Sequence, residues 1–297
     1  MRLRKRHDRG GKAMIKINDF NNIPDDLQTN KIFVNPEKSK MSNSTLSFDG
    51  NNNIVFIEDG VNIADSSIRF VGNNSVLFLG ASNHSYLLNV SINNQSTVYI
   101  GRNNYFNGKL TAITSEGRNI IIGDDCLFSY GICVRVADPH LIYDAKTKER
   151  INPSKSVFIG DHVWVGQNAM VLKGTTVGSG SVIGAGAVVS GKRIESNTVY
   201  AGNPAKKIKS GIFYEKPCVH QWTEAETKKH KRCDSREHIY GDGASTVDVT
   251  AVDRRLTAAL DSEERLKLLK EKIRSDCSKN RFFIGEENYK KKSLFKR

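Results

Sequence analysis

The sequence predicts a mainly β protein that coils into a parallel β-helix, with a projecting loop and a helical C-terminal extension. Three observations lead to this prediction. A six-residue repeat runs from 156 to 191, a looser repeat of about 22 residues precedes it, and helical spacing of apolar residues replaces both after residue 214. Such repeats indicate a solenoid, because each unit buries its apolar face only against its neighbours.

The six-residue repeat places an aliphatic anchor at every sixth position, followed in most cases by glycine. The anchors are Ile159, Val165, Val171, Val177, Ile183 and Val189, and the series breaks at Glu195. Each unit is one short strand and a turn, and three units close a triangular coil whose anchors point inward. The next coil stacks below at a strand spacing of about 4.8 Å. Small residues at the corners let the backbones of successive coils approach closely.

The looser repeat extends this coil toward the N-terminus. Its matching aliphatic residues are Ile57, Leu79, Ile100 and Ile122, separated by 22, 21 and 22 residues. This step fits one coil of about 18 residues plus a corner loop, and the asparagine and glycine between strands suit tight turns. We therefore expect the β-helix over 51–214 and a lead-in over 14–50. Residues 1–13 are expected to be disordered or derived from an expression vector.

One interval is too long for a single coil. The step from Ile122 to Ile159 is 37 residues, nearly two coils, and it contains the polar stretch ADPHLIYDAKTKERINPSK. That composition does not suit a buried strand, so we expect a loop over about 138–155 that projects from the β-helix. Loops held on a rigid scaffold frequently carry binding and catalytic residues.

The C-terminal extension, 215–297, is predicted to be helical. Thr223 and Glu226 have the spacing of a capping box, for a helix that runs to about Glu237. From Ala251 to Ile273, apolar residues recur at helical spacing with charges between them, which predicts an amphipathic helix. Such a helix typically packs against its own chain or a sister subunit.

Composition and charge narrow the possible functions. The 297 residues carry a net charge of +13, which attracts anions, but no nucleic-acid-binding module accompanies the charge. No apolar run reaches the roughly 20 residues that span a bilayer. The five cysteines form no CxxC pair, so neither a disulfide framework nor a zinc site is expected. Scattered thiols fit a reducing cytoplasm.

Two segments resemble a known enzyme family. Ile159–Lys209, which ends in YAGNPAKKIK, and the motif DPHLIYD at 138–144 are similar to those of acetyl-CoA-dependent hexapeptide-repeat O-acetyltransferases. The resemblance implies a left-handed β-helix and a homotrimer with active sites at its subunit interfaces. Within the family, the Asn-rich coils, the extension and the spacing of His140 and Trp164 most resemble enzymes that acetylate sialic acid in capsular polysaccharide. This implies a cytoplasmic enzyme, peripheral to the capsule machinery of the inner membrane.

The resemblance also implies a general base and an adjacent tryptophan. His140 matches the position of the family's catalytic histidine, and an imidazole suits the task because its ordinary pKa lies near the working pH. Trp164 is implied to lie beside His140 across a subunit boundary, at the thioester end of acetyl-CoA. His162 is the next candidate, although its place in the repeat predicts a solvent-facing or structural side chain. The remaining histidines lie in no supporting motif.

The implied coenzyme groove runs between two β-helices. By motif position its contacts fall near Gln167, Ala185 and Ser190, in addition to Trp164. The phosphates of the coenzyme suit lysine, and the lysines at the end of the repeat are Lys192, Lys206, Lys207 and Lys209. The segment SGKRIESN is one residue longer than the common family form, which leaves the choice among these lysines open. No metal is expected.

Three alternatives remain open. A zinc hydratase on the same fold needs three converging histidines, and only His140 and His162 lie in the second half of the repeat. A related transferase acting on a small nucleotide-linked sugar or on serine would use the same base, whereas a non-catalytic polysaccharide-binding β-helix would need none. The net charge favours an anionic polysaccharide as acceptor, because long-range attraction accelerates their encounter.

Overall fold

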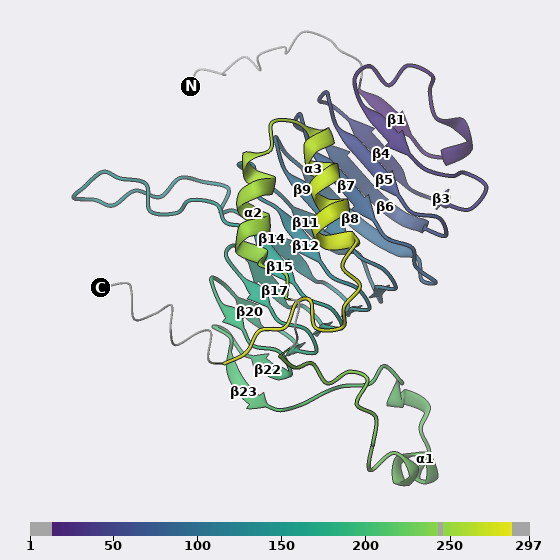
Figure 1. The fold of residues 1–297 in the computed structure, drawn as a ribbon, viewed down its shortest axis with the longest axis vertical. Helices are drawn as coiled ribbons and strands as arrows, with labels where there is room; N and C mark the ends of the chain where they lie inside the picture. The colour runs from purple at the N-terminus through teal and green to yellow at the C-terminus, as the bar shows by residue number, and fades with distance from the viewer. Residues whose placement is uncertain (1–13, 243–245, 287–297) are drawn as a thin grey trace, which may run out of the picture.

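The computed structural model describes residues 14–242 and 246–286, which form a three-sided prism of mainly parallel strands with an extension along one side (Figure 1). The predicted fold class, a left-handed parallel β-helix, is confirmed. Residues 1–13 and 287–297, to which parts of the sequence predictions refer, lie outside the described residues.

Three sheets, here called A, B and C, form the sides of the prism and contain nine, eight and six strands in the described residues. Sheet A contains, in spatial order, β1 (Ile15–Ile17), β4 (Thr45–Phe48), β6 (Asn62–Phe70), β8 (Tyr86–Ile92), β11 (Leu110–Ile113), β14 (Cys133–Arg135), β17 (Met170–Leu172) and β20 (Val188–Val189), with β3 (Lys40–Ser42) beside β6. Sheet B contains β2 (Lys31–Phe33), β5 (Ile54–Ile57), β7 (Val76–Leu79), β9 (Thr97–Ile100), β12 (Ile120–Ile122), β15 (Val157–Ile159), β18 (Thr176–Val177) and β21 (Arg193–Ile194). Sheet C contains β10 (Tyr105–Phe106), β13 (Leu127–Phe128), β16 (Trp164–Val165), β19 (Val182–Ile183), β22 (Thr198–Ala201) and β23 (Lys206–Ser210).

The register of sheet B shows that the repeats stack as coils. Ile122 pairs with Ile100 on one side and with Ile159 on the other, although the two steps in sequence are 22 and 37 residues. These side chains are buried in the prism core. Val177 pairs with Ile194, one residue before Glu195. The column of inward-facing anchors therefore continues at Ile194, although the strict six-residue spacing breaks there.

The β-helix begins earlier than predicted. Strand β2 pairs with β5, and both β3 and β4 pair with β6, all in parallel. The segment 14–50 is therefore not a separate lead-in, because residues 31–48 already form a coil and β1 closes its end by pairing antiparallel with β4. The connection from Asn35 to Ser44 is mostly polar, which hides the repeat there.

Successive coils approach closely at the corner between sheets B and C. The Asp124 side chain accepts a hydrogen bond from the amide of Arg102, and Asp161 accepts one from the amide of Asp124, at 2.7 Å each. A Cβ at Gly101 or Gly123 would lie only 2.1 or 2.4 Å from these carboxylate oxygens. The glycine after the anchor is thus required by contact between coils.

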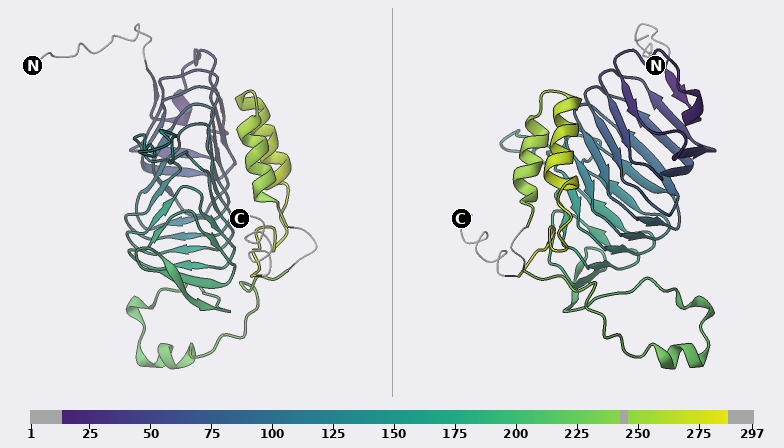
Figure 2. Two further views of the ribbon diagram at one scale, coloured as in Figure 1. Left: turned by 90° about the vertical axis from the view of Figure 1, so that its left-hand side faces the viewer. Right: turned by 45° about the vertical axis from the view of Figure 1, so that its right-hand side comes forward.

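From Val247 onward, the C-terminal extension returns along the outer face of sheet B, whereas its first part, with α1 (Glu224–Lys229), hangs away from the end of the prism (Figures 1 and 2). Helices α2 (Val249–Ala258) and α3 (Ser262–Leu269), followed by a π-helical turn over Lys270–Arg274, bury an apolar face there. The packed side chains include Ile54, Val76, Phe78, Tyr99, Ile121 and Phe158 from the sheet and Val252, Leu256, Leu266, Leu269 and Ile273 from the extension. Full burial of one such side chain contributes about 1.5–3 kcal/mol, so these helices belong to the same folded unit.

The helices of the extension are shorter than predicted. The single helix expected over 251–273 breaks at Ala259, whose carbonyl oxygen accepts a hydrogen bond from the buried Arg265. The predicted capping box is present, but the helix that it opens, α1 (Glu224–Lys229), ends well before Glu237. Short 3-10 helices occur at Phe20–Asn22 and Val219–Gln221. None of the described helices has the length and apolar character needed to cross a membrane.

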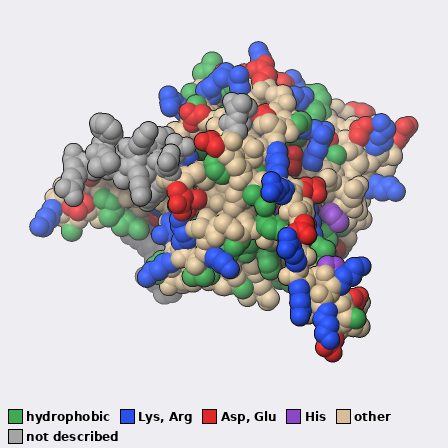
Figure 3. Space-filling view, turned by 60° about the horizontal axis from the view of Figure 1, so that its bottom comes forward, with side chains coloured by type: hydrophobic (Ala, Val, Ile, Leu, Met, Phe, Trp, Pro, Cys, Tyr) green, Lys and Arg blue, Asp and Glu red, His purple; other side chains and the backbone are tan. Residues whose placement is uncertain are grey.

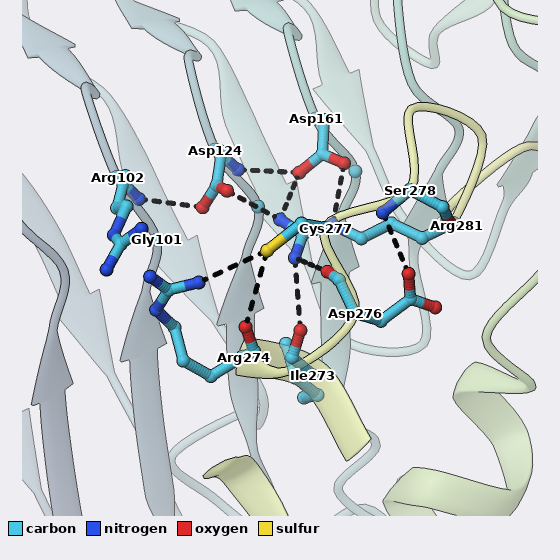
Figure 4. A network of polar contacts seen from close by, with 12 residues as sticks. Gly101, Arg102, Asp124, Asp161, Ile273, Arg274, Asp276, Cys277, Ser278 and Arg281 are labelled. Carbon is cyan, nitrogen blue, oxygen red and sulfur yellow. Dashed lines mark hydrogen bonds and ion pairs between the residues drawn. The ribbon is translucent and has the colours of Figure 1, made fainter. Parts of the chain in front are cut away.

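One buried arginine fastens the extension to the prism (Figure 4). Arg281, 1% exposed, donates hydrogen bonds of 2.7 and 2.8 Å to the Asp161 carboxylate and lies 3.0 Å from Asp124. It also donates to the carbonyl oxygens of Ile273 and Asp276. Burial alone would lower the pKa of Arg281, but the hydrogen bonds and charge of Asp161 raise it. The arginine therefore stays charged and links three parts of the chain.

Candidate active site

The loop between β14 and β15 projects from the corner where sheet A meets sheet B (Figure 1). It occupies the segment 138–155, and Tyr143 and Arg150 pair across it in an isolated antiparallel bridge. His140 lies on its first leg and is exposed, and its imidazole makes no hydrogen bond to any residue that the structure describes.

A buried asparagine fixes the backbone at His140. The Asn152 amide donates to the carbonyl oxygen of His140 at 2.7 Å and to the Asp138 carboxylate at 3.2 Å. The side-chain oxygen of Asn152 accepts from the amide of Ile142 at 2.9 Å. Lys173, on the neighbouring coil, pairs with Asp138 at 2.5 Å. His140 therefore combines a fixed backbone with an imidazole open to solvent.

A charged pair anchors the second leg of the loop. Arg150 donates hydrogen bonds of 2.7 and 3.1 Å to the two oxygens of Glu116, and Ser154 donates a further one. The hydrogen bonds from Arg150 and Ser154 lower the pKa of Glu116 to about 2. The pair thus persists under acidic conditions that protonate an ordinary glutamate.

Trp164 lies on another side of the prism. It belongs to β16 of sheet C, is 39% exposed, and stands in register between Leu127 and Val182. Its ring centroid is 5.8 Å from that of Tyr214. Within the described part of the chain, no hydrogen bond or ring contact links Trp164 to His140, so one chain does not bring the expected pair together.

The expected coenzyme contacts divide between different corners. Gln167 and Ala185 are exposed on successive coils where sheet C turns into sheet A, and the amide of Gly186 donates to the Gln167 carbonyl at 2.7 Å. Ser190 and Lys192 follow β20, at the corner from which the His140 loop projects. The other candidates, Lys206, Lys207 and Lys209, lie on β23, which pairs with β22 of sheet C. The expected contacts therefore lie in three places: at the two edges of sheet A, and on the last strand of sheet C.

The four candidate lysines are not equivalent. The Lys207 ammonium lies 2.9 Å from Glu286 and 3.1 Å from Glu195, and the hydrogen bond with Glu286 is the main cause of its raised pKa. Two carboxylates thus already neutralise Lys207. The other three, Lys192, Lys206 and Lys209, have no carboxylate partner in the portion of the chain described, which leaves their ammonium groups available to phosphates.

His162 is buried and unavailable as a base. Its Nδ1 lies 2.7 Å from Asp125 and its Nε2 lies 3.1 Å from the carbonyl oxygen of Tyr214. The repeat predicted a side chain at His162 that either faces solvent or is structural, and the structure shows the second: the ring is fully buried and hydrogen-bonded. Asp125, His162 and His238 bring possible metal-ligand atoms within 4.8 Å of one another. A ring nitrogen binds a metal in the plane of its ring, however, and the two imidazoles are nearly parallel with centroids 3.7 Å apart, so they do not converge on one ion.

Comparison with known proteins places the repeat in a described family. Residues 156–191 match "Bacterial transferase hexapeptide (six repeats)". A polysialic acid O-acetyltransferase of Neisseria meningitidis is 36% identical over 133 residues, and one of Escherichia coli O1:K1 / APEC is 40% identical over 119 residues. These matches cover 44% and 40% of this chain, which spans 61% and 38% of the lengths of the two relatives.

Two solved structures share the fold. The polySia-specific acetyltransferase NeuO is 32% identical with a TM-score of 0.58, and the match covers 68% of this chain and 93% of that one. The polysialic acid O-acetyltransferase OatWY is also 32% identical with a TM-score of 0.61, and the match covers 68% of this chain and 95% of that one.

Proposed function

We propose that this chain, which belongs to the bacterial hexapeptide-repeat transferases, is an O-acetyltransferase that moves an acetyl group from acetyl-CoA to a hydroxyl of sialic acid in a capsular polysaccharide. The observation that carries the proposal is His140, an exposed imidazole on a projecting loop whose backbone Asn152 fixes. The relatives, which are polysialic acid O-acetyltransferases, support the choice of acceptor.

In this proposal His140 is the general base. An unprotonated ring nitrogen accepts the proton of the acceptor hydroxyl while the hydroxyl oxygen forms a bond to the thioester carbon. The carbonyl oxygen gains negative charge, which the indole N–H of Trp164, a donor only, stabilises. As the C–S bond breaks, the imidazolium returns its proton to the departing thiolate, and the histidine ends in its starting state.

Two copies of the chain complete such a site. His140, Ser190 and Lys192 lie at one edge of sheet A, whereas Gln167 and Ala185 lie at the other. The extension covers sheet B, but the outer face of sheet A carries a column of half-buried apolar side chains in register, namely Cys133, Met170 and Val188. These observations support a cyclic homotrimer in which one edge of each prism faces the opposite edge of the next.

A basic cleft at the root of the loop supports an anionic acceptor. Arg118 and Lys155 precede the adjacent strands β12 and β15 and line this cleft with Thr250 and Asp253. Neither cation has a carboxylate partner among the residues described, and the Nε of Arg118 is buried without a hydrogen-bond partner there. The carboxylate of Asp253 instead accepts a hydrogen bond from the Asn119 amide at 2.9 Å. Figure 3 shows further basic side chains spread over the end of the molecule. Acetylation in the cytoplasm, before export of the polymer, completes the proposal.

The acceptor is tested by comparing a long sialic acid polymer with the sialic acid monomer at saturating radiolabelled acetyl-CoA. The KM for the polymer is expected to be the lower one and to rise with salt, which screens the attraction. Replacing both Arg118 and Lys155 by glutamine is expected to raise the polymer KM roughly tenfold, equivalent to about 1.4 kcal/mol, and to leave the monomer KM unchanged. Lys40→Gln, at an exposed lysine of β3, is the control.

Equal use of polymer and monomer would contradict a polymeric acceptor, as would a preference for a nucleotide-linked sugar or for serine. The transferase activity itself would survive that result. A chain that binds the polymer but transfers no acetyl group to any acceptor would instead be a non-catalytic polysaccharide-binding protein.

A further inference from the structure

A column of four aromatic rings joins the C-terminal extension to Trp164. The fully buried ring of His162 lies between the ring of His238, with centroids 3.7 Å and planes 6° apart, and that of Tyr214, at 4.1 Å and 13°. Tyr214 in turn lies 5.8 Å from Trp164. Tyr214 and His238 follow the last strand of the prism, whereas His162 and Trp164 belong to one coil. The proposed acetyl transfer uses Trp164 but none of the other three.

Hydrogen bonds fix the ring of His162 within this column. Its two nitrogens face the Asp125 carboxylate and the carbonyl oxygen of Tyr214, and both of these groups only accept hydrogen bonds. These two contacts, at 2.7 and 3.1 Å, fix the plane of the ring. Burial raises the pKa of Asp125, but the hydrogen bonds from His162 and Lys216 outweigh it and leave the pKa lowered, so the carboxylate is ionised. His162 therefore contacts Tyr214 in two ways. Its ring stacks on the Tyr214 ring, and its Nε2 lies within hydrogen-bond distance of the Tyr214 backbone carbonyl.

We infer that Tyr214 is a positioning residue for Trp164, held in place for this role by the stack of His162 and His238. The inference rests on the proposed function, in which the indole N–H of Trp164 meets the developing oxyanion. Trp164 is partly exposed, and its neighbours in register, Leu127 and Val182, are smaller aliphatic residues. Tyr214 is its aromatic contact in the described structure, and it limits where the indole can turn. Orientation matters because a misplacement of about 1 Å costs on the order of a hundredfold in rate.

The support depends on the ring of Tyr214 and not on its hydroxyl. The phenol oxygen is buried and has no hydrogen-bond partner among the residues described. Tyr214→Phe therefore retains the stack with His162 and the contact with Trp164, whereas Tyr214→Ala removes both. The two variants form a matched pair that differs only in the presence of the ring.

The test observes Trp164 directly by fluorescence. The chain contains two tryptophans, so Trp222→Phe leaves Trp164 as the only indole. In that background Tyr214→Ala is expected to lower the fluorescence anisotropy of Trp164 and to increase its quenching by acrylamide, while Tyr214→Phe changes neither. In acetyl transfer Tyr214→Ala is expected to lower kcat about tenfold and to change the KM for acetyl-CoA less than about twofold, because orientation acts in the transition state.

The pH dependence gives a second readout. Burial and the charge of His162 lower the pKa of His238 below its ordinary 6.5, against the opposing charges of Glu215, Glu237 and Asp125. An undocked His238 therefore binds a proton more readily than the stacked ring, so stacking is complete above pH 6.5 and weakens as the pH falls below it. The anisotropy of Trp164 is expected to fall over that range. His238→Phe, which keeps a ring but cannot titrate, is expected to abolish the decline.

Unchanged anisotropy of Trp164 in Tyr214→Ala would overturn the inference whatever happens to kcat, since any loss of rate would then have another cause. Changed anisotropy with unchanged kcat would overturn it as well. If the wild-type chain transfers no acetyl group, the proposed function fails, and the fluorescence measurement still decides whether Tyr214 orders Trp164.

Discussion

Replacing His140 with alanine is expected to lower kcat for acetyl transfer by roughly 100- to 10,000-fold, the usual contribution of a general acid–base group, without altering the fold. The imidazole makes no hydrogen bond within the described chain, and Asn152 holds the backbone carbonyl, which alanine retains. The measurement is kcat at saturating acetyl-CoA and acceptor, with circular dichroism and the oligomeric state recorded on the same sample.

His220→Ala is the matched control for this change. His220 is also exposed, but it lies in the 3-10 helix Val219–Gln221 of the extension, outside the loop. Its replacement is expected to leave kcat unchanged. Near wild-type turnover by a folded His140→Ala protein would show that another group takes the proton.

Replacing Arg281 with methionine is expected to lower the free energy of unfolding by about 3–5 kcal/mol, the usual cost of removing one partner of a buried ion pair. The change leaves the carboxylates of Asp161 and Asp124 without the Arg281 cation and removes the hydrogen bonds that Arg281 donates to the carbonyl oxygens of Ile273 and Asp276. Urea denaturation followed by circular dichroism measures the loss. Limited proteolysis near α2 and α3 shows whether the extension separates from sheet B.

Two further variants make this result specific. Arg232→Met removes a surface arginine that pairs with Asp234 while 84% exposed, and it is expected to have no measurable effect on stability. Adding Asp161→Asn to Arg281→Met is expected to recover part of the loss, because it removes an unpaired buried charge. An unfolding free energy that Arg281→Met leaves unchanged would show that this network does not hold the extension.

The repeat predicted the strand register because parallel coils place equivalent residues directly above one another. Ile122 and Ile159 pair as the repeat requires even across the long loop. The repeat does not reveal the first coil, because the connections in that coil are polar. It also places the anchor after Val189 at Glu195 and not at Ile194, because the corner before β21 is one residue shorter than the repeat. A repeat carries information on inward-facing and turn residues, and little on how the stack begins and ends.

The candidate site was predictable only in part. A motif identified the loop and His140, but the residues that support the loop, Asn152 and Glu116, belong to no motif or repeat and act through contacts formed only in the folded chain. The contact of His162 with His238 joins the corner of the β-helix before β16 to a part of the extension, between α1 and α2, that has no sequence repeat. Spacing along the chain could not reveal that contact.

A shared active site is tested most directly by co-expressing two variants that are each expected to be inactive, His140→Ala and Trp164→Ala, with different affinity tags. In a cyclic trimer, each interface takes His140 from one subunit and Trp164 from the next. Random assembly from equal amounts therefore leaves about one quarter of the interfaces with both wild-type residues.

The result that we predict is recovery of up to about a quarter of the wild-type kcat in the co-assembled protein. The same two variants, assembled separately and then combined without exchange of subunits, should remain inactive. Absence of activity in a co-assembled sample that carries both tags and is folded would contradict a site built from His140 of one chain and Trp164 of another.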